Sequence, residues 1–128
     1  MRTHKLRVWD FNEKRFQFFD LHNITVPDRL LSQDKYPVQP FIGLLDKNMT
    51  PIYEGDVVQG LSKGERKPPR GENPDVKGEV QYSYDLCAYV VDWYHPFSQI
   101  ETSSLEILGN MMENYIYNET GQLVKQHT

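Results

Sequence analysis

The chain has 128 residues, of which 38% are hydrophobic and 25% charged, with a formal net charge of −4 and a pI near 5.5. This length suits one domain spanning 1–128, and the acidic balance argues against a surface that binds phosphate throughout. One cysteine excludes an internal disulfide, the charged start lacks the apolar stretch of a signal peptide, and no segment reaches the roughly 18 apolar residues of a membrane span, so a cytoplasmic location without membrane contact is expected.

The first predicted element is an N-terminal hairpin. Apolar residues alternate over 6–9, and an aromatic group follows at 16–19 after a polar turn at 12–14. Trp9 lies within this strand pattern, so we expect a core aromatic rather than a platform for base stacking. Beyond Pro27, residues 28–34 have the composition of one helical turn.

Two further strands are predicted between residues 38 and 58. The turn between them falls at 46–48, where the Asp46 side chain can bond its own backbone. Gly55 interrupts the second apolar run at 52–58, which indicates a turn, a bulge or a close backbone approach.

Residues 60–77 are predicted to form a long exposed loop rich in Gly, Pro, Lys, Arg and Glu. Unstructured connections longer than roughly 12–15 residues are uncommon in small domains and tend to be functional or disordered. Five cations against three acids make this loop a candidate contact for an acidic partner or for nucleic acid. The cations proposed for that contact are Lys63, Arg66, Lys67 and Arg70.

The clearest strand pattern follows, because apolar Val80, Tyr82 and Tyr84 alternate with polar residues. The next run, 86–93, is apolar on both faces and is expected to be a buried strand that carries Cys87 and Trp93 in the core. Cys87 is therefore interpreted as an inert core thiol rather than a nucleophile.

The C-terminal part is predicted to contain a short strand at 105–110, a final helical turn at 111–117 and a frayed tail at 118–128. Together these elements predict a mainly β fold, a small SH3-like or related β-barrel with an N-terminal hairpin and little helix.

Motifs for chemistry are scarce. His4, His22, His95 and His127 lack metal-ligand spacing, and no phosphate-binding glycine loop, nucleophile elbow or HExxH run is present. We therefore assign no catalytic residue, no metal and no cofactor. The one carboxylate group that could converge, Asp46, Glu54 and Asp56, is interpreted as turn-forming. Arg7 is expected to pair with a carboxylate across the sheet.

Three blocks of the chain together resemble the YopX family of phage and prophage proteins. They are KLRVWD at 5–10, FIGLLDKN at 41–48 followed by IYEGDVV at 52–58, and LEILGN at 105–110 followed by Glu113 and Asn114. The segments occur in the family's order and span nearly the whole chain. The motif residues singled out are Trp9, Asp10, Gly43, Tyr53, Glu54, Gly55, Asp56, Gly109 and Asn110.

This chain departs from the family pattern in two places. Met49, Thr50 and Pro51 follow the 46–48 turn where the family has a glycine, and the 60–77 loop is longer than is typical. The resemblance implies a phage or prophage origin, a mainly β fold and self-association, but no activity.

Two functions remain open from the sequence. The first is a non-enzymatic, homo-oligomeric accessory protein that binds a host or phage protein. The second is a nucleic-acid-binding small barrel in which Arg2, Lys5, Lys14, Arg15 and the loop cations contact phosphate.

Overall fold

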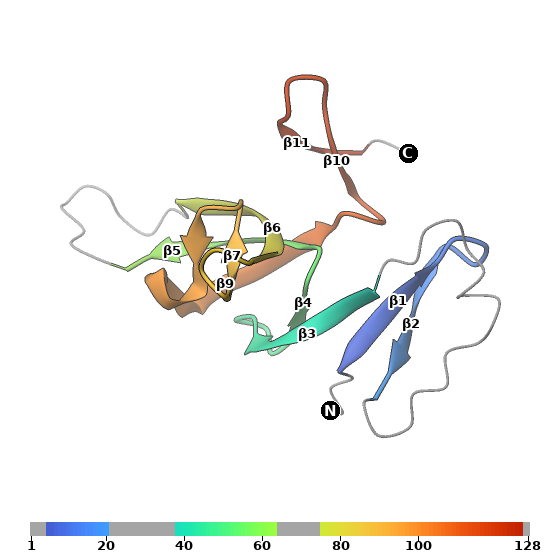
Figure 1. Cartoon of the computed structure of the whole chain (residues 1–128), viewed down its shortest axis with the longest axis horizontal. Helices are drawn as coiled ribbons and strands as arrows, with labels where there is room; N and C mark the ends of the chain where they lie inside the picture. The colour runs from blue at the N-terminus through green and yellow to red at the C-terminus, as the bar shows by residue number, and fades with distance from the viewer. Residues whose placement is uncertain (1–4, 21–37, 64–74, 127–128) are drawn as a thin grey trace.

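The computed structural model describes residues 5–20, 38–63 and 75–126, which form two larger β-sheets and a separate hairpin (Figure 1). The described residues contain no α-helix, only a 3₁₀ turn at Phe97–Gln99. The prediction of a mainly β fold with little helix is confirmed. A search of the same residues finds no helix with the length and apolar character to cross a membrane.

The first sheet has four strands in the order β2-β1-β3-β4. Their bounds are Leu6–Asp10 for β1, Arg15–Phe19 for β2, Val38–Leu45 for β3 and Pro51–Tyr53 for β4. The predicted N-terminal hairpin is confirmed, since β1 and β2 pair antiparallel. Trp9 is only 6% exposed, as expected of a core aromatic, and its ring meets that of Phe16 edge-on at 4.9 Å.

The second sheet has five strands in the order β8-β7-β6-β5-β9 and curls into half a barrel (Figure 1). The bounds are Asp56–Ser62 for β5, Val76–Ser83 for β6, Ala88–Val91 for β7, His95–Pro96 for β8 and Ile100–Asn110 for β9. The strand predicted over 79–84 is present to Ser83, but burial does not alternate along it: Glu79 is buried next to Val80, and Tyr84 lies in the following turn and is 85% exposed. The buried core cluster consists of Ile52, Val58, Val76, Val80, Val91, Phe97, Ile100 and Leu105.

The expected 60–77 loop is shorter at both ends than the composition indicated. β5 continues to Ser62 and β6 begins at Val76. The two strands pair directly, with Gly60 opposite Val76. Residues 64–74 lie outside the described residues, as does the helical turn expected at 28–34.

The predicted buried strand at 86–93 is wrong in its bounds and in its burial. Only Ala88–Val91 is strand, and both ends of the apolar run form turns. Cys87 (φ 50°) and Trp93 (φ 59°) take the left-handed backbone conformation that reverses the chain. The turns direct both side chains outward, so Trp93 is 60% exposed and Cys87 is an exposed free thiol rather than a core thiol.

The C-terminal region is also more regular than expected. Residues 111–114 form a turn, and β10 (Tyr115–Tyr117) pairs antiparallel with β11 (Leu123–Lys125). The predicted helical turn at 111–117 and the frayed tail at 118–128 are therefore wrong over the described residues. The physical reason is side-chain capping: Asn118 Oδ1 accepts the amides of Thr120 and Gln122 and closes the hairpin.

Candidate functional site

The segments that carry the sequence motifs meet at the turn between β4 and β5, formed by residues 53–56. Gly55 takes φ 91°, which confirms the predicted turn and explains the glycine. Backbone hydrogen bonds tie this turn to three other parts of the fold. They run from Glu54 N–H to Pro40 C=O at 3.0 Å, from Gly55 N–H to Val80 C=O at 2.9 Å, and from Met111 N–H to Gly55 C=O at 3.0 Å. The turn is thus a joint between the two sheets.

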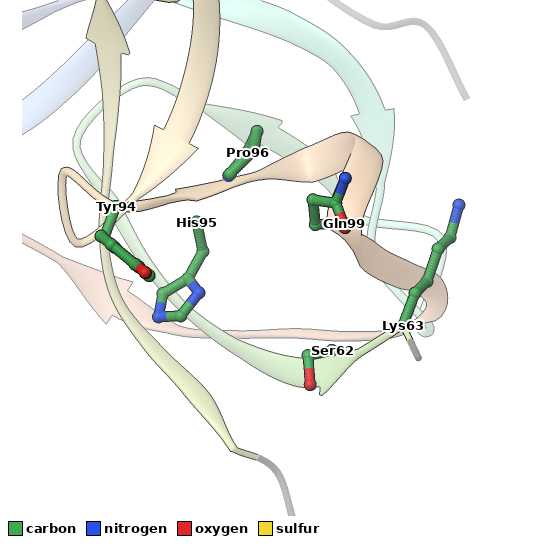
Figure 2. A pocket seen from close by; sticks show the side chains of 6 residues that line it. All are labelled: Ser62, Lys63, Tyr94, His95, Pro96 and Gln99. Atoms are coloured by element: carbon green, nitrogen blue, oxygen red, sulfur yellow. The ribbon is translucent and has the colours of Figure 1, made fainter. Parts of the chain in front are cut away.

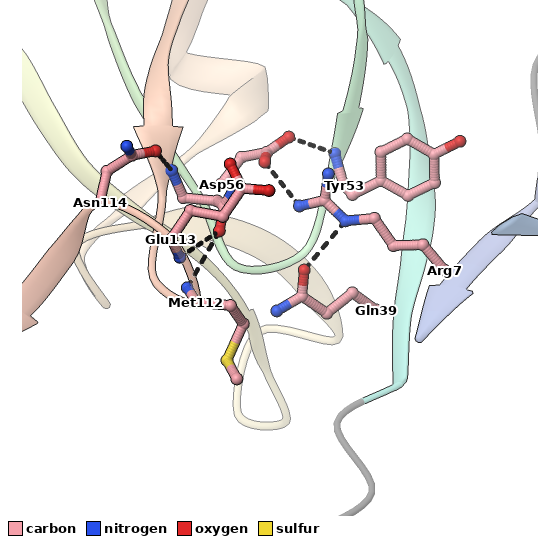
Figure 3. A network of polar contacts seen from close by, with 8 residues as sticks. Arg7, Gln39, Tyr53, Asp56, Met112, Glu113 and Asn114 are labelled. Carbon is pink, nitrogen blue, oxygen red and sulfur yellow. Dashed lines mark hydrogen bonds and ion pairs between the residues drawn. The ribbon is translucent and has the colours of Figure 1, made fainter. Parts of the chain in front are cut away.

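A buried ion pair lies beside this joint (Figure 3). Arg7 Nη2 on β1 donates to Asp56 Oδ1 on β5 at 2.6 Å, and the side chains are 8% and 3% exposed. Arg7 Nε donates to Gln39 Oε1 at 3.0 Å, and Asp56 Oδ2 accepts the Tyr53 amide at 2.8 Å. The expected partner of Arg7 is therefore found, and it belongs to the other sheet.

Aromatic rings flank the same guanidinium. Its central carbon lies 4.0 Å from the ring centroid of Phe16 and 4.6 Å from that of Tyr53. Desolvated cation–π contacts of this kind contribute about 2 kcal/mol. Arg7 on β1 thus contacts β2, β3, β4 and β5. These contacts indicate a structural role, in which Arg7 holds the two sheets together.

The three carboxylates considered for acid–base chemistry have separate partners. Asp46 accepts the amides of Asn48, Thr50 and Ile107, which confirms its role in the turn. Burial raises the pKa of Asp56, while Arg7 and the Tyr53 amide oppose that rise. Burial also raises the pKa of Glu54, which the Tyr82 amide opposes and the Glu79 carboxylate reinforces.

Polar side chains at strand ends organise other turns in the same way. Asp10 Oδ1 accepts the amides of Asn12 and Glu13, and Asn110 Oδ1 accepts those of Met112 and Glu113. An oxygen that accepts amides two and three residues ahead fixes the reversal of the chain. The motif residues Asp10 and Asn110 therefore stabilise the turns that follow their strands.

Two motif glycines are required for different reasons: Gly43 for its positive φ and Gly109 for a close approach of the chain. Gly43 takes φ 92° in β3, where the register against β4 shifts. At Gly109 an added Cβ would lie 2.8 Å from Asn114 Oδ1 and 2.9 Å from the ring of Tyr115. Gly109 therefore lets the turn after β9 pack closely against its own strand.

A second buried carboxylate links the C-terminal hairpin to the half-barrel. The Tyr117 hydroxyl donates to Glu79 Oε1 at 2.6 Å. Burial raises the pKa of Glu79, and the bond from Tyr117 partly offsets that rise. Burial and the neighbouring carboxylate raise the pKa of Tyr117 as well. No sequence pattern predicts this contact, since the residues are 38 positions apart.

An open depression of about 340 Å³ lies between the end of β5, strand β8 and the 3₁₀ turn that follows β8 (Figure 2). Lys63 stands at its rim, and the Lys63 amide donates to the Gln99 carbonyl at 2.7 Å. Asp75 accepts hydrogen bonds from the amide and the hydroxyl of Ser62. These bonds hold the end of β5 next to the residue that precedes β6. The lining residues are Ser62, Lys63, Tyr94, His95, Pro96 and Gln99.

Of the four loop cations proposed to contact a partner, the structure describes Lys63 alone. Arg66, Lys67 and Arg70 lie outside the described residues, as does Arg2. Lys14 and Arg15 are exposed near the β1–β2 turn, whereas Lys5 lies over the ring of Phe41 in the four-stranded sheet. Within 5–20, 38–63 and 75–126, no group of three or more His, Cys, Asp or Glu residues could hold a metal ion.

The fold and these contacts define a small, mainly β protein whose motif residues build a joint between two sheets. The YopX protein family model matches residues 2–115, so the chain belongs to the YopX family. No curated protein matches it. The crystal structure of protein EF1440 from Enterococcus faecalis is similar with a TM-score of 0.51 and 19% identity, covering 85% of this chain and 93% of that one. At that identity the likeness concerns the fold.

Proposed function

We propose that the protein is a non-enzymatic, self-associating interaction module of a phage or prophage, acting in the host cytoplasm. The observation that carries this proposal is the β10–β11 hairpin, which projects away from both sheets (Figure 1). On it Ile116 is 47% exposed and Tyr117 is 44% exposed. The resemblance to the YopX family also implies self-association.

A two-stranded hairpin of this size needs packing against another surface to be stable. Each strand has three residues, and among the described residues they pair only with each other. Isolated two-stranded hairpins are marginally stable in water, and their open edges favour pairing with another chain. Buried Tyr115 and the bond from Tyr117 to Glu79 attach the base, but they leave Ile116 in solvent.

A second copy of this chain is the occupant that we propose. Because most soluble oligomers are symmetric, two hairpins can pack by the same face and bury Ile116 and Val124 of both copies. A host or phage protein is the further partner of this module. Two of the three carboxylates that could have converged support a non-enzymatic role, since Asp46 and Asp56 hold the fold together.

Light scattering after size-exclusion chromatography tests the proposal. We expect a mass that is a multiple of 15.1 kDa, and a shift toward 15.1 kDa in the Ile116→Glu variant. Leu86→Glu is the matched control, because Leu86 is 56% exposed in the β6–β7 turn, away from the hairpin. A mass of 15.1 kDa for the unaltered protein at every concentration would overturn self-association.

The further partner calls for a different experiment. Tagged protein is recovered from cells that carry the phage, with and without nuclease treatment, and copurifying proteins are compared between the unaltered protein and Ile116→Glu. A partner that survives nuclease and binds the unaltered protein supports a protein-interaction module. Partners that are lost on nuclease treatment would instead indicate binding through nucleic acid.

A further inference from the structure

We infer that the depression between β5 and β8 binds single-stranded nucleic acid, with Lys63 and His95 contacting phosphate and Tyr94 stacking on a base (Figure 2). This inference is independent of self-association through the hairpin. It rests on the side chains around the depression and on the backbone that presents them.

Trp93 and Tyr94 lie on the turn between β7 and β8, which packs against Gly78 of β6. Asp92 (φ 56°) and Trp93 (φ 59°) both take the left-handed conformation, in which Gly and Asn are the favoured residues. A Cβ on Gly78 would lie 2.6 Å from Asp92 Cβ, so only glycine lets this turn fold onto β6. The result is a tryptophan and a tyrosine in solvent, 60% and 77% exposed.

Exposed aromatic rings are a means of binding unpaired bases. A base stacked on an aromatic ring contributes affinity whatever its identity, because every base has a π-face. The ring of Tyr94 meets that of His95 edge-on at 4.9 Å, which steadies both rings at the rim. A duplex buries its base faces within its own stack, so the geometry selects single strands.

Polar groups for a phosphate lie beside these rings. Lys63 brings a positive charge, and the His95 imidazole and Gln99 amide can both form hydrogen bonds with phosphate oxygens. The hydroxyl and amide of Ser62 both donate to Asp75, a carboxylate that is not among the lining residues. The depression is open, as a passing strand requires, rather than an enclosed cavity for a small ligand.

The charge of the site sets the expected salt dependence. With a net charge of −4 the protein attracts phosphate only locally, so few phosphates are contacted. Each contacted phosphate of a single strand lowers the logarithm of the binding constant by about 0.7 per tenfold rise in salt. We therefore expect weak, salt-sensitive binding that is measurable at low ionic strength.

Tryptophan fluorescence provides the assay. Trp93 is exposed and adjacent to Tyr94, whereas Trp9 is buried in the other sheet. Titration with an oligodeoxythymidylate of about 12 nucleotides should quench the emission, and the same titration of Trp93→Phe should leave it unchanged. Fluorescence anisotropy of a dye-labelled oligonucleotide follows binding to variants that lack the reporter.

Paired variants separate the site from general charge and aromatic effects. We expect Tyr94→Ala to weaken binding about 5- to 140-fold, as for the loss of one stacked base, and Tyr84→Ala, at 85% exposure on another turn, to have no effect. Lys63→Ala should weaken binding and reduce the salt dependence by about one phosphate contact. Lys125→Ala on the hairpin is its control.

Three outcomes would overturn the inference. The first is no quenching and no anisotropy change at low salt. The second is equal binding of duplex DNA or heparin, which would show attraction to polyanions without base stacking. The third is equal loss of binding in Tyr94→Ala and Tyr84→Ala.

Discussion

Arg7 and Asp56 are 49 positions apart in the sequence, yet their side chains meet at 2.6 Å and join the four-stranded sheet to the half-barrel. Both are buried, so neither charge can be solvated by water if its partner is removed. The pair lies where three segments of the YopX pattern come together.

Removal of the arginine should therefore destabilise the protein strongly. We expect Arg7→Leu to lower the free energy of unfolding by about 3–5 kcal/mol, because it leaves a buried carboxylate unpaired. Urea denaturation followed by circular dichroism measures the change. Lys47→Leu is the control: Lys47 and Glu106 pair at 3.3 Å on the surface, and its loss should change stability little. Equal losses in the two variants would contradict the structural role of Arg7.

Two glycines with nearly the same backbone conformation separate backbone strain from crowding. Gly43 and Gly55 have φ values of 92° and 91°, but an added Cβ meets nothing within 4 Å at Gly43 and lies 2.3 Å from Gln39 Nε2 at Gly55. Alanine at either position should cost about 1–2 kcal/mol for the left-handed backbone. Gly55→Ala should cost about 1–3 kcal/mol more, because Gln39 must move and leave Arg7 Nε without its acceptor.

Denaturant unfolding of the two glycine variants gives the comparison directly. If Gly43→Ala is as unstable as Gly55→Ala, the close approach of Gln39 carries no cost of its own. A loss of the Arg7 contact in Gly55→Ala should also make that variant insensitive to Gln39→Ala.

Stability should depend on pH through Glu79. Burial raises the pKa of this carboxyl in the folded state above the ordinary 4.5, so the folded protein binds more protons than the unfolded chain in that range. The contribution of Glu79 to stability is thus fully present below about pH 4.5 and is lost as pH rises through the folded-state pKa.

Glu79→Gln should remove that component of the pH dependence while it keeps an acceptor for the Tyr117 hydroxyl. Free energies of unfolding measured from about pH 4.5 to about pH 7 should fall more steeply for the unaltered protein than for the variant. Glu119→Gln, an exposed side chain on the hairpin loop, controls for the loss of one carboxylate. Parallel curves for the unaltered protein and Glu79→Gln would refute the role of Glu79.

Cys87 should react in the folded protein. It is exposed at the β6–β7 turn, with its Sγ 3.5 Å from the Tyr84 carbonyl oxygen. We expect a chromogenic thiol reagent to modify it at a similar rate in native buffer and in denaturant, because thiol reactivity requires access. A rate that rises many-fold on denaturation would instead place the thiol in the core.

The sequence by itself determined the elements whose signals are local. Alternation over 6–9 and 80–84 predicted strands, which the structure contains as β1 and β6, and the turns at Asp46 and Gly55 follow from side-chain capping and backbone freedom. Even so, the apolar run at 86–93 misled, because its composition suited a buried strand while both of its ends reverse direction. The C-terminal hairpin was missed because its strands have only three residues each.

Tertiary structure alone decided which distant side chains meet. The partner of Arg7, the bond between Tyr117 and Glu79, and the depression between β5 and β8 depend on strand order and register. Strand order and register bring together residues that are 38 or 49 positions apart in the sequence. Local periodicity carries no information about them, because a strand's pattern specifies which face is buried and not which strand lies beside it.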